Sequence, residues 1–252
     1  MSTAGSLEAE EVRAMFDRIA GVYDLLNSAM TAGLHHRWRE RAADLAHVGP
    51  GSRVLDVATG TGDLAIELAR RVAGGGEVLG VDFSEAMLDR ARHKAAGPSA
   101  PGLVRPRFEW ADATALPYPD HSFDAATVGF GVRNFDDLAG GLAEMVRVVR
   151  PGGRVVVLEM TTPTRAPLSL FFALWFDRVV PALGRATGAL ARRAPHGKAA
   201  SATIGDAYSY LPNSVKRFPG PVALAAELER AGLEQIHYVI TAGGIVAIHA
   251  GT

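Results

Sequence analysis

Short apolar runs alternate with amphipathic segments through the middle of the chain. The runs typical of buried strands cover 53–58, 77–82, 107–111, 123–128 and 154–159. Between them, apolar residues recur at helical spacing over 63–71, 84–95 and 137–150. After residue 220 the pattern continues with a helix at 222–231 and strands at 233–240 and 245–250. Strands that alternate with crossover helices are typical of a parallel sheet covered on both faces, so the pattern predicts an α/β fold.

Two regions lie outside this alternation. Residues 1–50 look helical and precede the first strand, so we expect them to cover another part of the protein. Residues 161–220 contain an apolar helix at 168–183, a basic stretch at 185–198 and a segment rich in Tyr and Pro. The pattern shows neither an internal repeat nor a long linker. We therefore expect one domain over 1–252.

Composition narrows the class of protein. The 26 Lys and Arg residues are balanced by 27 Asp and Glu residues, and the cations are scattered, so a nucleic acid is not an expected partner. The absence of Cys excludes disulfides, iron–sulfur clusters and a Cys nucleophile, and the His spacing suggests no metal. The first fifteen residues lack the apolar segment of a secretory signal, and no run reaches the about 20 apolar residues of a membrane span. A cytoplasmic location is therefore expected.

A glycine-rich turn joins the first predicted strand to the helix that follows it. Its sequence fits the pattern GxGxxA over 60–65, in which the two glycines are Gly60 and Gly62. Such a turn lets a ligand approach the backbone and exposes the N–H groups at a helix N-terminus, although many glycine turns bind nothing. Asp82 ends the second strand about twenty residues later, where a carboxylate can accept both hydroxyls of a ribose. Together these features indicate a cofactor that contains a nucleoside.

The carboxylates around this turn distinguish between cofactors. Asp56 ends the first strand, Asp63 opens the next helix and Asp112 follows the third strand. They would repel the diphosphate of a nicotinamide dinucleotide, whereas S-adenosylmethionine lacks phosphate and carries a sulfonium and an ammonium. Each carboxylate also has a structural interpretation, as a helix cap for Asp63 and Asp82 or as a turn residue for Asp112. The set favours S-adenosylmethionine.

Several longer segments are typical of one enzyme family. They are 23–27 with 31–38, 54–63, 115–119, 130–134, 147–154 with 158–161, 208–212, 218–219 and 243–249. Over nearly its whole length the chain resembles the ubiquinone/menaquinone biosynthesis C-methyltransferases, a family of class I S-adenosylmethionine-dependent methyltransferases. The resemblance implies a Rossmann-like fold with a mostly parallel seven-stranded sheet flanked by helices. It also implies a helical cap at 1–50, a cofactor-binding core at 51–160, a substrate-side insertion at 161–220, and a C-terminal helix and strands at 221–252.

The resemblance also implies an activity and a set of site residues. The activity is transfer of a methyl group to a ring carbon of a prenylated quinol. The favoured acceptor is demethylmenaquinol, and the second is the 2-methoxy-6-polyprenyl-1,4-benzoquinol of ubiquinone biosynthesis. The expected cofactor residues are Asp56, Gly60, Thr61, Gly62, Asp82, Phe83, Met87, Asp112, Ala113 and Gly129. Phe83 and Met87 are equally well explained as core residues, and at Gly129 the family often has a hydroxyl side chain.

Three residues are expected at the acceptor. Arg133 and Asn134 follow the fourth strand at the carboxyl edge of the sheet, where substrates collect in open α/β folds. Arg133 could stabilise an oxyanion or position a water, or simply pair with Asp136 or Asp137. Tyr23 could close over the pocket or be a core aromatic. His249 reads better as a structural histidine than as a catalytic base.

The apolar helix at 168–183 leaves two interpretations open. It could be core or the face of a homodimer. It could instead line a groove for an isoprenoid tail and give the enzyme a peripheral contact with the inner face of the cytoplasmic membrane, aided by the basic stretch. Two other functions also remain as alternatives: methylation of a soluble aromatic or polyketide-like metabolite, and a binding module without catalysis.

Overall fold

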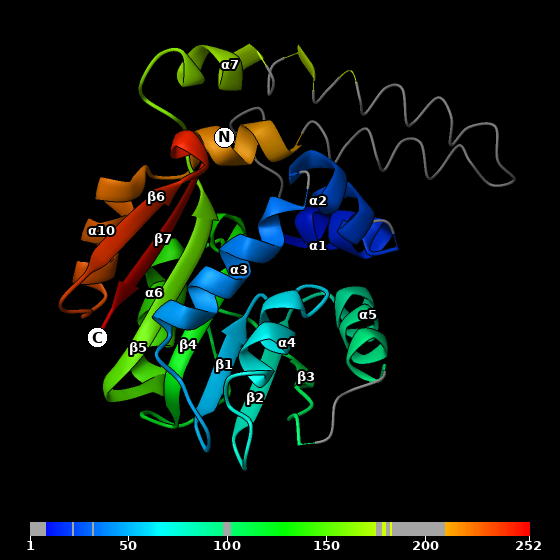
Figure 1. The fold of residues 1–252 in the computed structure, drawn as a ribbon, viewed down its shortest axis with the longest axis vertical. Coiled ribbons are helices and arrows are strands. Elements are labelled where there is room, and N and C mark those ends of the chain that lie inside the picture. The colour runs from blue at the N-terminus through cyan, green and yellow to red at the C-terminus, as the bar shows by residue number, and fades with distance from the viewer. Residues whose placement is uncertain are drawn as a thin grey trace, which may run out of the picture.

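The fold is built on a seven-stranded sheet with the strand order β3-β2-β1-β4-β5-β7-β6 (Figure 1). The computed structural model describes residues 9–21, 23–31, 33–97, 102–174, 178–179, 182 and 210–252. The strands are β1 (Arg53–Val57), β2 (Glu77–Asp82), β3 (Arg107–Trp110), β4 (Phe123–Gly129), β5 (Val149–Met160), β6 (His237–Thr241) and β7 (Val246–Gly251). Only β7 runs antiparallel to its neighbours, so the predicted mostly parallel α/β sheet is confirmed.

Helices cover both faces of this sheet. They are α1 (Ala9–Ile19), α2 (Tyr23–Thr31), α3 (Leu34–Leu45), α4 (Asp63–Ala69), α5 (Glu85–Ala95), α6 (Leu138–Val148), α7 (Leu168–Leu174) and α10 (Pro221–Arg230). Val54 of β1 packs in one core with α3, α4 and α5, whereas Leu55 packs in the other core with α6 and α10. Successive strand residues point to opposite faces, and both faces are buried here. This explains why the strands read as unbroken apolar runs.

The predicted boundary between α6 and β5 is shifted. The sequence predicts a helix to 150, a stop at Pro151-Gly152-Gly153 and a strand from 154, but α6 ends at Val148 and β5 begins at Val149. Val149 pairs with Phe123 of β4, and the register shifts before Arg154 pairs with Ala125. The Pro-Gly-Gly segment therefore forms an irregularity inside the strand, which the positive φ of Gly152 permits.

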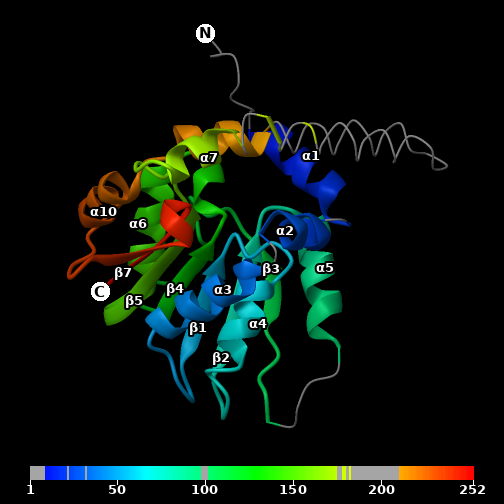
Figure 2. The same ribbon diagram turned by 45° about the horizontal axis from the view of Figure 1, so that its top comes forward.

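The N-terminal helices differ in their roles. Figure 2 shows α1 and α2 over the carboxyl ends of the strands, whereas α3 lies along the sheet. Trp38, Ala42 and Ala43 of α3 are buried against the core, so this helix belongs to a sheet layer. Of the expected insertion, the structure describes α7 and a helical stretch at 210–217, and the basic stretch at 185–198 lies outside the described residues. No helix in the described ranges is long and apolar enough to cross a membrane.

Candidate active site

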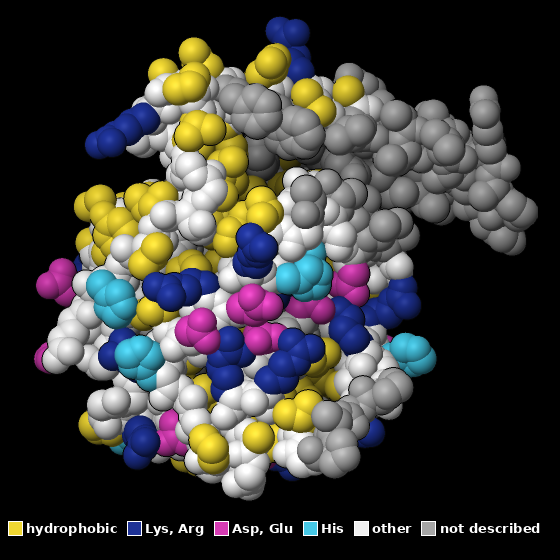
Figure 3. Space-filling view, viewed as in Figure 1, with side chains coloured by type: hydrophobic (Ala, Val, Ile, Leu, Met, Phe, Trp, Pro, Cys, Tyr) yellow, Lys and Arg dark blue, Asp and Glu magenta, His cyan; other side chains and the backbone are white. Residues whose placement is uncertain are grey.

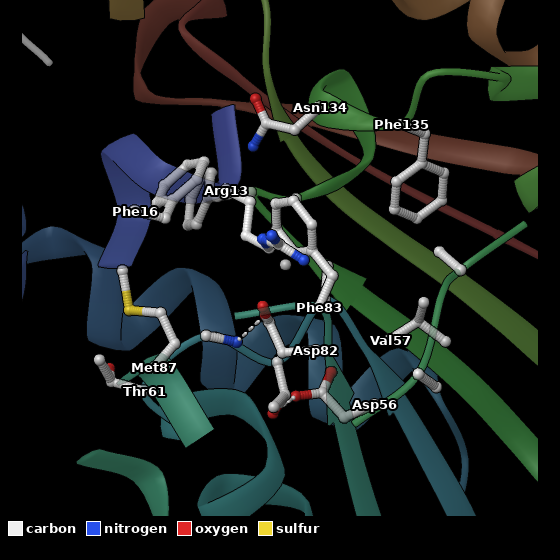
Figure 4. A pocket seen from close by; sticks show the side chains of 18 of the residues that line it. Arg13, Phe16, Asp56, Val57, Thr61, Asp82, Phe83, Met87, Asn134 and Phe135 are labelled. Atoms are coloured by element: carbon white, nitrogen blue, oxygen red, sulfur yellow. Dashed lines mark hydrogen bonds between the residues drawn. The ribbon is translucent and has the colours of Figure 1, made fainter. Parts of the chain in front are cut away.

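A cleft opens at the carboxyl ends of β1, β2 and β4, beneath α1 and α2 (Figure 4). From β1 the chain continues to β2 on one side, and later returns to β4 on the other side of β1. This is a topological switch point, where ligands bind in open α/β sheets. The expected site residues that line the cleft are Tyr23, Asp56, Gly60, Thr61, Asp82, Phe83, Met87, Asp112, Ala113, Gly129 and Asn134.

The glycine loop after β1 is shaped by two glycines with different surroundings. Both have a positive φ, 56° at Gly60 and 82° at Gly62. A Cβ on Gly62 would lie 2.8 Å from the ring of Phe108, so Gly62 permits close packing of the loop. A Cβ on Gly60 would meet no described atom within 4 Å, because Gly60 faces the cleft. Gly60 therefore leaves the backbone open to a ligand.

Asp82 ties the glycine loop to the start of α5. Its Oδ2 accepts the backbone N–H of Gly60 at 2.7 Å, and its Oδ1 accepts that of Ser84 at 3.0 Å. Ser84 is the N-cap of α5 and accepts the N–H of Met87. Burial raises the pKa of Asp82 to about 6. Asp82 thus supports the neighbouring cap and also lines the cleft.

Asp56 lies lower, in the floor of the cleft. Its carboxylate accepts the hydroxyls of Thr59 at 2.6 Å and Thr127 at 2.7 Å, and burial raises its pKa to about 6. Both oxygens of Asp56 therefore hold β1, β4 and the loop together. Asp112, which also lines the cleft, accepts the N–H and the hydroxyl of Thr114, so it forms the turn predicted as its structural interpretation.

Asp63 is paired rather than used as a helix cap. The N-cap of α4 is Gly62, and the Asp63 carboxylate lies 2.5 Å from Lys94 and 3.3 Å from Arg39. Burial alone would raise the pKa of Asp63, but these two cations hold it below its ordinary value. The capping interpretation of Asp63 is therefore wrong, because two long cationic side chains reach it from α3 and α5.

Acidic side chains nevertheless outnumber basic ones in the cleft lining. The acidic residues are Glu10, Asp56, Asp63, Asp82, Asp112 and Asp136, and the basic ones are Arg13 and Arg39. This balance suits a cationic ligand and opposes a diphosphate. The residues present thus fit S-adenosylmethionine: an open glycine backbone, a carboxylate at the end of β2, and apolar neighbours in Phe83 and Ala113.

Thr61 connects the cofactor end of the cleft to the cap. Its hydroxyl donates to Oδ1 of Asp24 in α2 at 2.6 Å and accepts from Lys94 at 3.0 Å. Lys94 also pairs with Asp24 at 2.8 Å. Sequence reasoning missed Asp24 and Lys94, although Asp24 belongs to the segment 23–27 that resembles the family. The expected contact of Thr61 with the cofactor stays a prediction.

Aromatic side chains line the side of the cleft beneath α1. Phe16 of α1 makes edge contacts with Tyr23 at 6.1 Å and with Phe83 at 6.4 Å between ring centroids. Met87 is almost fully buried with Ile19 beneath them and also lines the cleft, so the core and cofactor interpretations of Met87 are compatible. Phe83 and Tyr23 are thus placed to contact a ligand.

Gly129 ends β4 at the wall of the cleft. A Cβ at this position would lie 3.1 Å from Cδ2 of Leu64, closer than most side chains approach. A hydroxyl side chain here, as the family often has, would require Leu64 to move. The local packing therefore explains the glycine.

Arg133 lies behind the cleft and is not among the described residues that line it. Its Nη1 donates to Glu159 at 2.6 Å and to the carbonyl of Phe130 at 2.7 Å, and the Arg133 side chain is only 6% exposed. The predicted alternative, an ion pair of Arg133 with Asp136 or Asp137, is wrong. Arg133 lies in η1 (Val132–Asn134), and its side chain instead reaches Glu159 of β5. Burial alone would lower the pKa of Arg133, but the Glu159 carboxylate raises it above its ordinary value.

The histidines have structural surroundings. The ring centroids of His35 and His36 lie 4.0 Å apart. His35 contacts Arg39 and Ser28, and burial lowers its pKa to about 4. His249 contacts the carbonyl of Pro221 at 2.8 Å, the partner that the sequence could not name. Within the described ranges, no cluster of three or more metal-binding side chains occurs.

The strand order, the antiparallel β7 and the acidic cleft define an S-adenosylmethionine-dependent methyltransferase. A solved S-adenosylmethionine-dependent methyltransferase from Aquifex aeolicus has the same fold, with a TM-score of 0.57 at 18% identity, over 84% of this chain and 88% of that one. One from Thermotoga maritima also gives 0.57, at 19% identity over 95% and 98%. The chain belongs to the ubiE/COQ5 methyltransferase family, whose model matches residues 4–252.

Relatives within this family align over nearly the full length of the chain. A demethylmenaquinone methyltransferase of Thermus thermophilus is 47% identical over 94% of this chain and 99% of its own. One of Deinococcus radiodurans is 43% identical over 94% and 90%. The ubiquinone/menaquinone biosynthesis C-methyltransferase UbiE of Teredinibacter turnerae is 38% identical over 97% and 92%. The resemblance stated from the sequence is therefore confirmed.

Proposed function

We propose that the protein transfers a methyl group from S-adenosylmethionine to a ring carbon of a prenylated quinol, with demethylmenaquinol as the acceptor. The observation that carries this proposal is the near full-length identity with relatives named demethylmenaquinone methyltransferase. Two of these relatives, at 47% and 43% identity, are more similar to the chain than the UbiE relative at 38%, and a third, of Desulfitobacterium hafniense, equals it at 38%. The benzoquinol of ubiquinone biosynthesis is the second candidate acceptor.

The acceptor side of the cleft supports C-methylation of an aromatic ring. S-adenosylmethionine supplies an electrophilic methyl group on its sulfonium, and a quinol that loses a hydroxyl proton gains charge on the adjacent ring carbon. Catalysis then depends on positioning the ring and stabilising its oxygen. Tyr23 and Phe16 provide aromatic surface, and Asn134 provides a polar group within the same lining. We propose that the quinol ring lies against these three residues.

Arg133 contributes from behind this surface. Its buried guanidinium pairs with Glu159, and the electrostatic influence of Tyr23 and Tyr210 adds to that of Glu159 in raising the pKa of Arg133. A fixed cation next to polar groups that face the acceptor favours negative charge on the acceptor oxygen. Arg133 therefore acts in this proposal as a positioning residue with an electrostatic effect. The direct contact of Arg133 with an oxyanion, expected from the sequence, is replaced in this proposal by an effect through the neighbouring side chains.

An exposed apolar surface next to the acceptor side supports a peripheral membrane contact at the inner face of the cytoplasmic membrane. Leu168, Leu170 and Leu174 of α7 are exposed, and Figure 3 shows apolar side chains gathered over this helix and over β6. Phe172, on the buried side of α7, packs with Val215 in the stretch at 210–217. Exposed leucines beside an acceptor site suit an enzyme whose substrate is dissolved in the bilayer. A homodimer through α7 is the competing interpretation.

The acceptor is tested with labelled S-adenosylmethionine and reduced candidate acceptors. The panel contains demethylmenaquinol, the methoxy-polyprenyl-benzoquinol and water-soluble phenols, with NMR of the product to locate the methyl group. We expect transfer to the ring carbon of demethylmenaquinol. Methylation of the soluble phenols alone would contradict the proposal and favour a soluble aromatic acceptor. Cofactor binding without transfer to any acceptor would favour a binding module.

A further inference from the structure

The side-chain amide of Asn134 is held by a residue that lies far away in the sequence. The hydroxyl of Tyr210 donates a hydrogen bond to Oδ1 of Asn134 at 2.9 Å, across 76 positions of the chain. Asn134 ends η1 and lines the cleft. Figure 4 shows its amide nitrogen turned toward the cleft and its oxygen turned away. The contact with Tyr210 is therefore made by the end of the amide that faces away from the ligand.

This contact decides which end of the amide the ligand meets. An amide has an acceptor oxygen at one end and two donor hydrogens at the other. Because the Asn134 oxygen accepts from Tyr210, its NH₂ group is left to donate into the cleft. A donor stabilises an acceptor oxygen that gains negative charge, whereas a flipped amide would present an oxygen and repel it.

The surroundings of Tyr210 keep its hydroxyl in this role. Burial raises the pKa of Tyr210, so the hydroxyl keeps its proton and remains a donor. The stretch that Tyr210 begins is anchored by Leu211 and Val215, which pack with Phe172 of α7 and with Met160 at the end of β5. The position of Tyr210 is thus set by packing against α7 and β5, independently of η1.

We infer that Tyr210 is a positioning residue that orients the side-chain amide of Asn134, so that its NH₂ group donates to the oxygen of the acceptor ring. The inference rests on the proposed function for the identity of the acceptor. The orientation of Asn134 can be measured without any acceptor, so the two ideas fail separately.

The kinetic test is a double-mutant cycle with Tyr210→Phe and Asn134→Ala, on whichever panel acceptor the wild type methylates. Tyr210→Phe should lower kcat about 10-fold through loss of one hydrogen bond, with the KM for S-adenosylmethionine unchanged. In the Asn134→Ala background the same change should alter kcat by less than about twofold. Tyr118→Phe is the matched control, since Tyr118 also donates its hydroxyl to a side-chain oxygen, that of Glu109 at 3.2 Å. Its kcat should equal that of the wild type.

The structural test uses the side-chain NH₂ resonance of Asn134 in the ¹H–¹⁵N NMR spectrum, identified by its loss in Asn134→Ala. We expect this resonance to move in Tyr210→Phe and to stay in place in Tyr118→Phe. A resonance that does not move, or effects of the two substitutions on kcat that simply multiply, would overturn the inference. If the resonance moves but no quinol is methylated, the positioning of Asn134 stands and the proposed acceptor is wrong.

Discussion

At the scale of residues, the site depends on carboxylates whose environments differ. Asp82 and Asp56 are both buried with a pKa raised to about 6. Asp56 has each of its oxygens bonded to a threonine hydroxyl, whereas Asp82 accepts two backbone N–H groups from residues that border the cleft. A carboxylate oxygen can accept more than one hydrogen bond, so Asp82 retains capacity for ribose hydroxyls.

Asp82 predicts a pH dependence of cofactor binding. Its pKa of about 6 means that it is ionised near neutrality and gains a proton as the pH falls through this value. The protonated acid is a weaker acceptor, so the affinity for S-adenosylmethionine should decrease from about pH 7.5 to about pH 5.5. Asp82→Asn should bind about 10- to 100-fold more weakly and lose most of this dependence, as measured by calorimetry.

The control for this pH dependence is Asp56→Asn. Asp56 titrates in the same range, but its hydrogen bonds serve the loop and the strands, so this variant should keep the decrease in affinity at low pH. An unchanged pH dependence in Asp82→Asn would show that another group is responsible.

At the scale of elements, the glycine loop combines two requirements. It must pack closely on β3, which Gly62 permits beside Phe108, and it must leave its backbone accessible, which Gly60 permits. The loop also contains Ala58 with a φ of 49°, and Phe130 at the end of β4 has a φ of 61°. Non-glycine residues in this region are strained, and such strain concentrates at ligand sites. Both residues line the cleft.

Alanine substitutions should separate the two glycines. Gly62→Ala places a Cβ 2.8 Å from Phe108 at a positive φ, so it should lower the free energy of unfolding by about 2–4 kcal/mol. Gly60→Ala adds only the cost of the positive φ, about 1–2 kcal/mol, but should weaken S-adenosylmethionine binding because its Cβ enters the cleft. Denaturant unfolding and calorimetry measure the two effects. Equal losses of stability would contradict this distinction.

At the scale of the whole molecule, the proposed cofactor and acceptor parts of the cleft are built from different segments. The parallel strands and the glycine loop form the cofactor part. The acceptor part combines α1, α2 and η1, and the stretch at 210–217 connects it to α7 (Figure 2). Helix α7, which has the exposed leucines, contacts this stretch through Phe172 and Val215, and Tyr210 of the same stretch bonds to Asn134. This arrangement allows the acceptor region to contact a bilayer surface without a change in the geometry of the sheet.

The surface of α7 should bind anionic bilayers. Leu170→Asp removes an apolar side chain that is 70% exposed and should weaken binding to phosphatidylglycerol vesicles about tenfold in flotation assays. Val222→Asp of α10 is the matched control, with 72% exposure on another helix, and should leave vesicle binding unchanged. Absence of vesicle binding, with a dimer in sedimentation that Leu170→Asp disrupts, would instead establish the homodimer interpretation.

Local features of the site were readable from the sequence. The glycine turn, Asp82 at the end of β2 and Asn134 after β4 are fixed by their position along a strand, and parallel strands bring their carboxyl ends to one edge. The N-cap role of Ser84 is also local, since it depends on Met87 three positions later. The family segments carried the rest of the prediction, and they indicated which chemistry this edge supports.

The sequence by itself determined the α/β architecture, the glycine loop and the acidic character of the cofactor end, because strand periodicity, turn chemistry and charge are properties of neighbouring positions. Only the tertiary structure decided the partners of Arg133, Thr61 and Asn134. Glu159, Asp24 and Tyr210 lie 26, 37 and 76 positions away from them. Such pairs depend on how helices cross the sheet edge, and no local pattern encodes the direction in which a long side chain turns there.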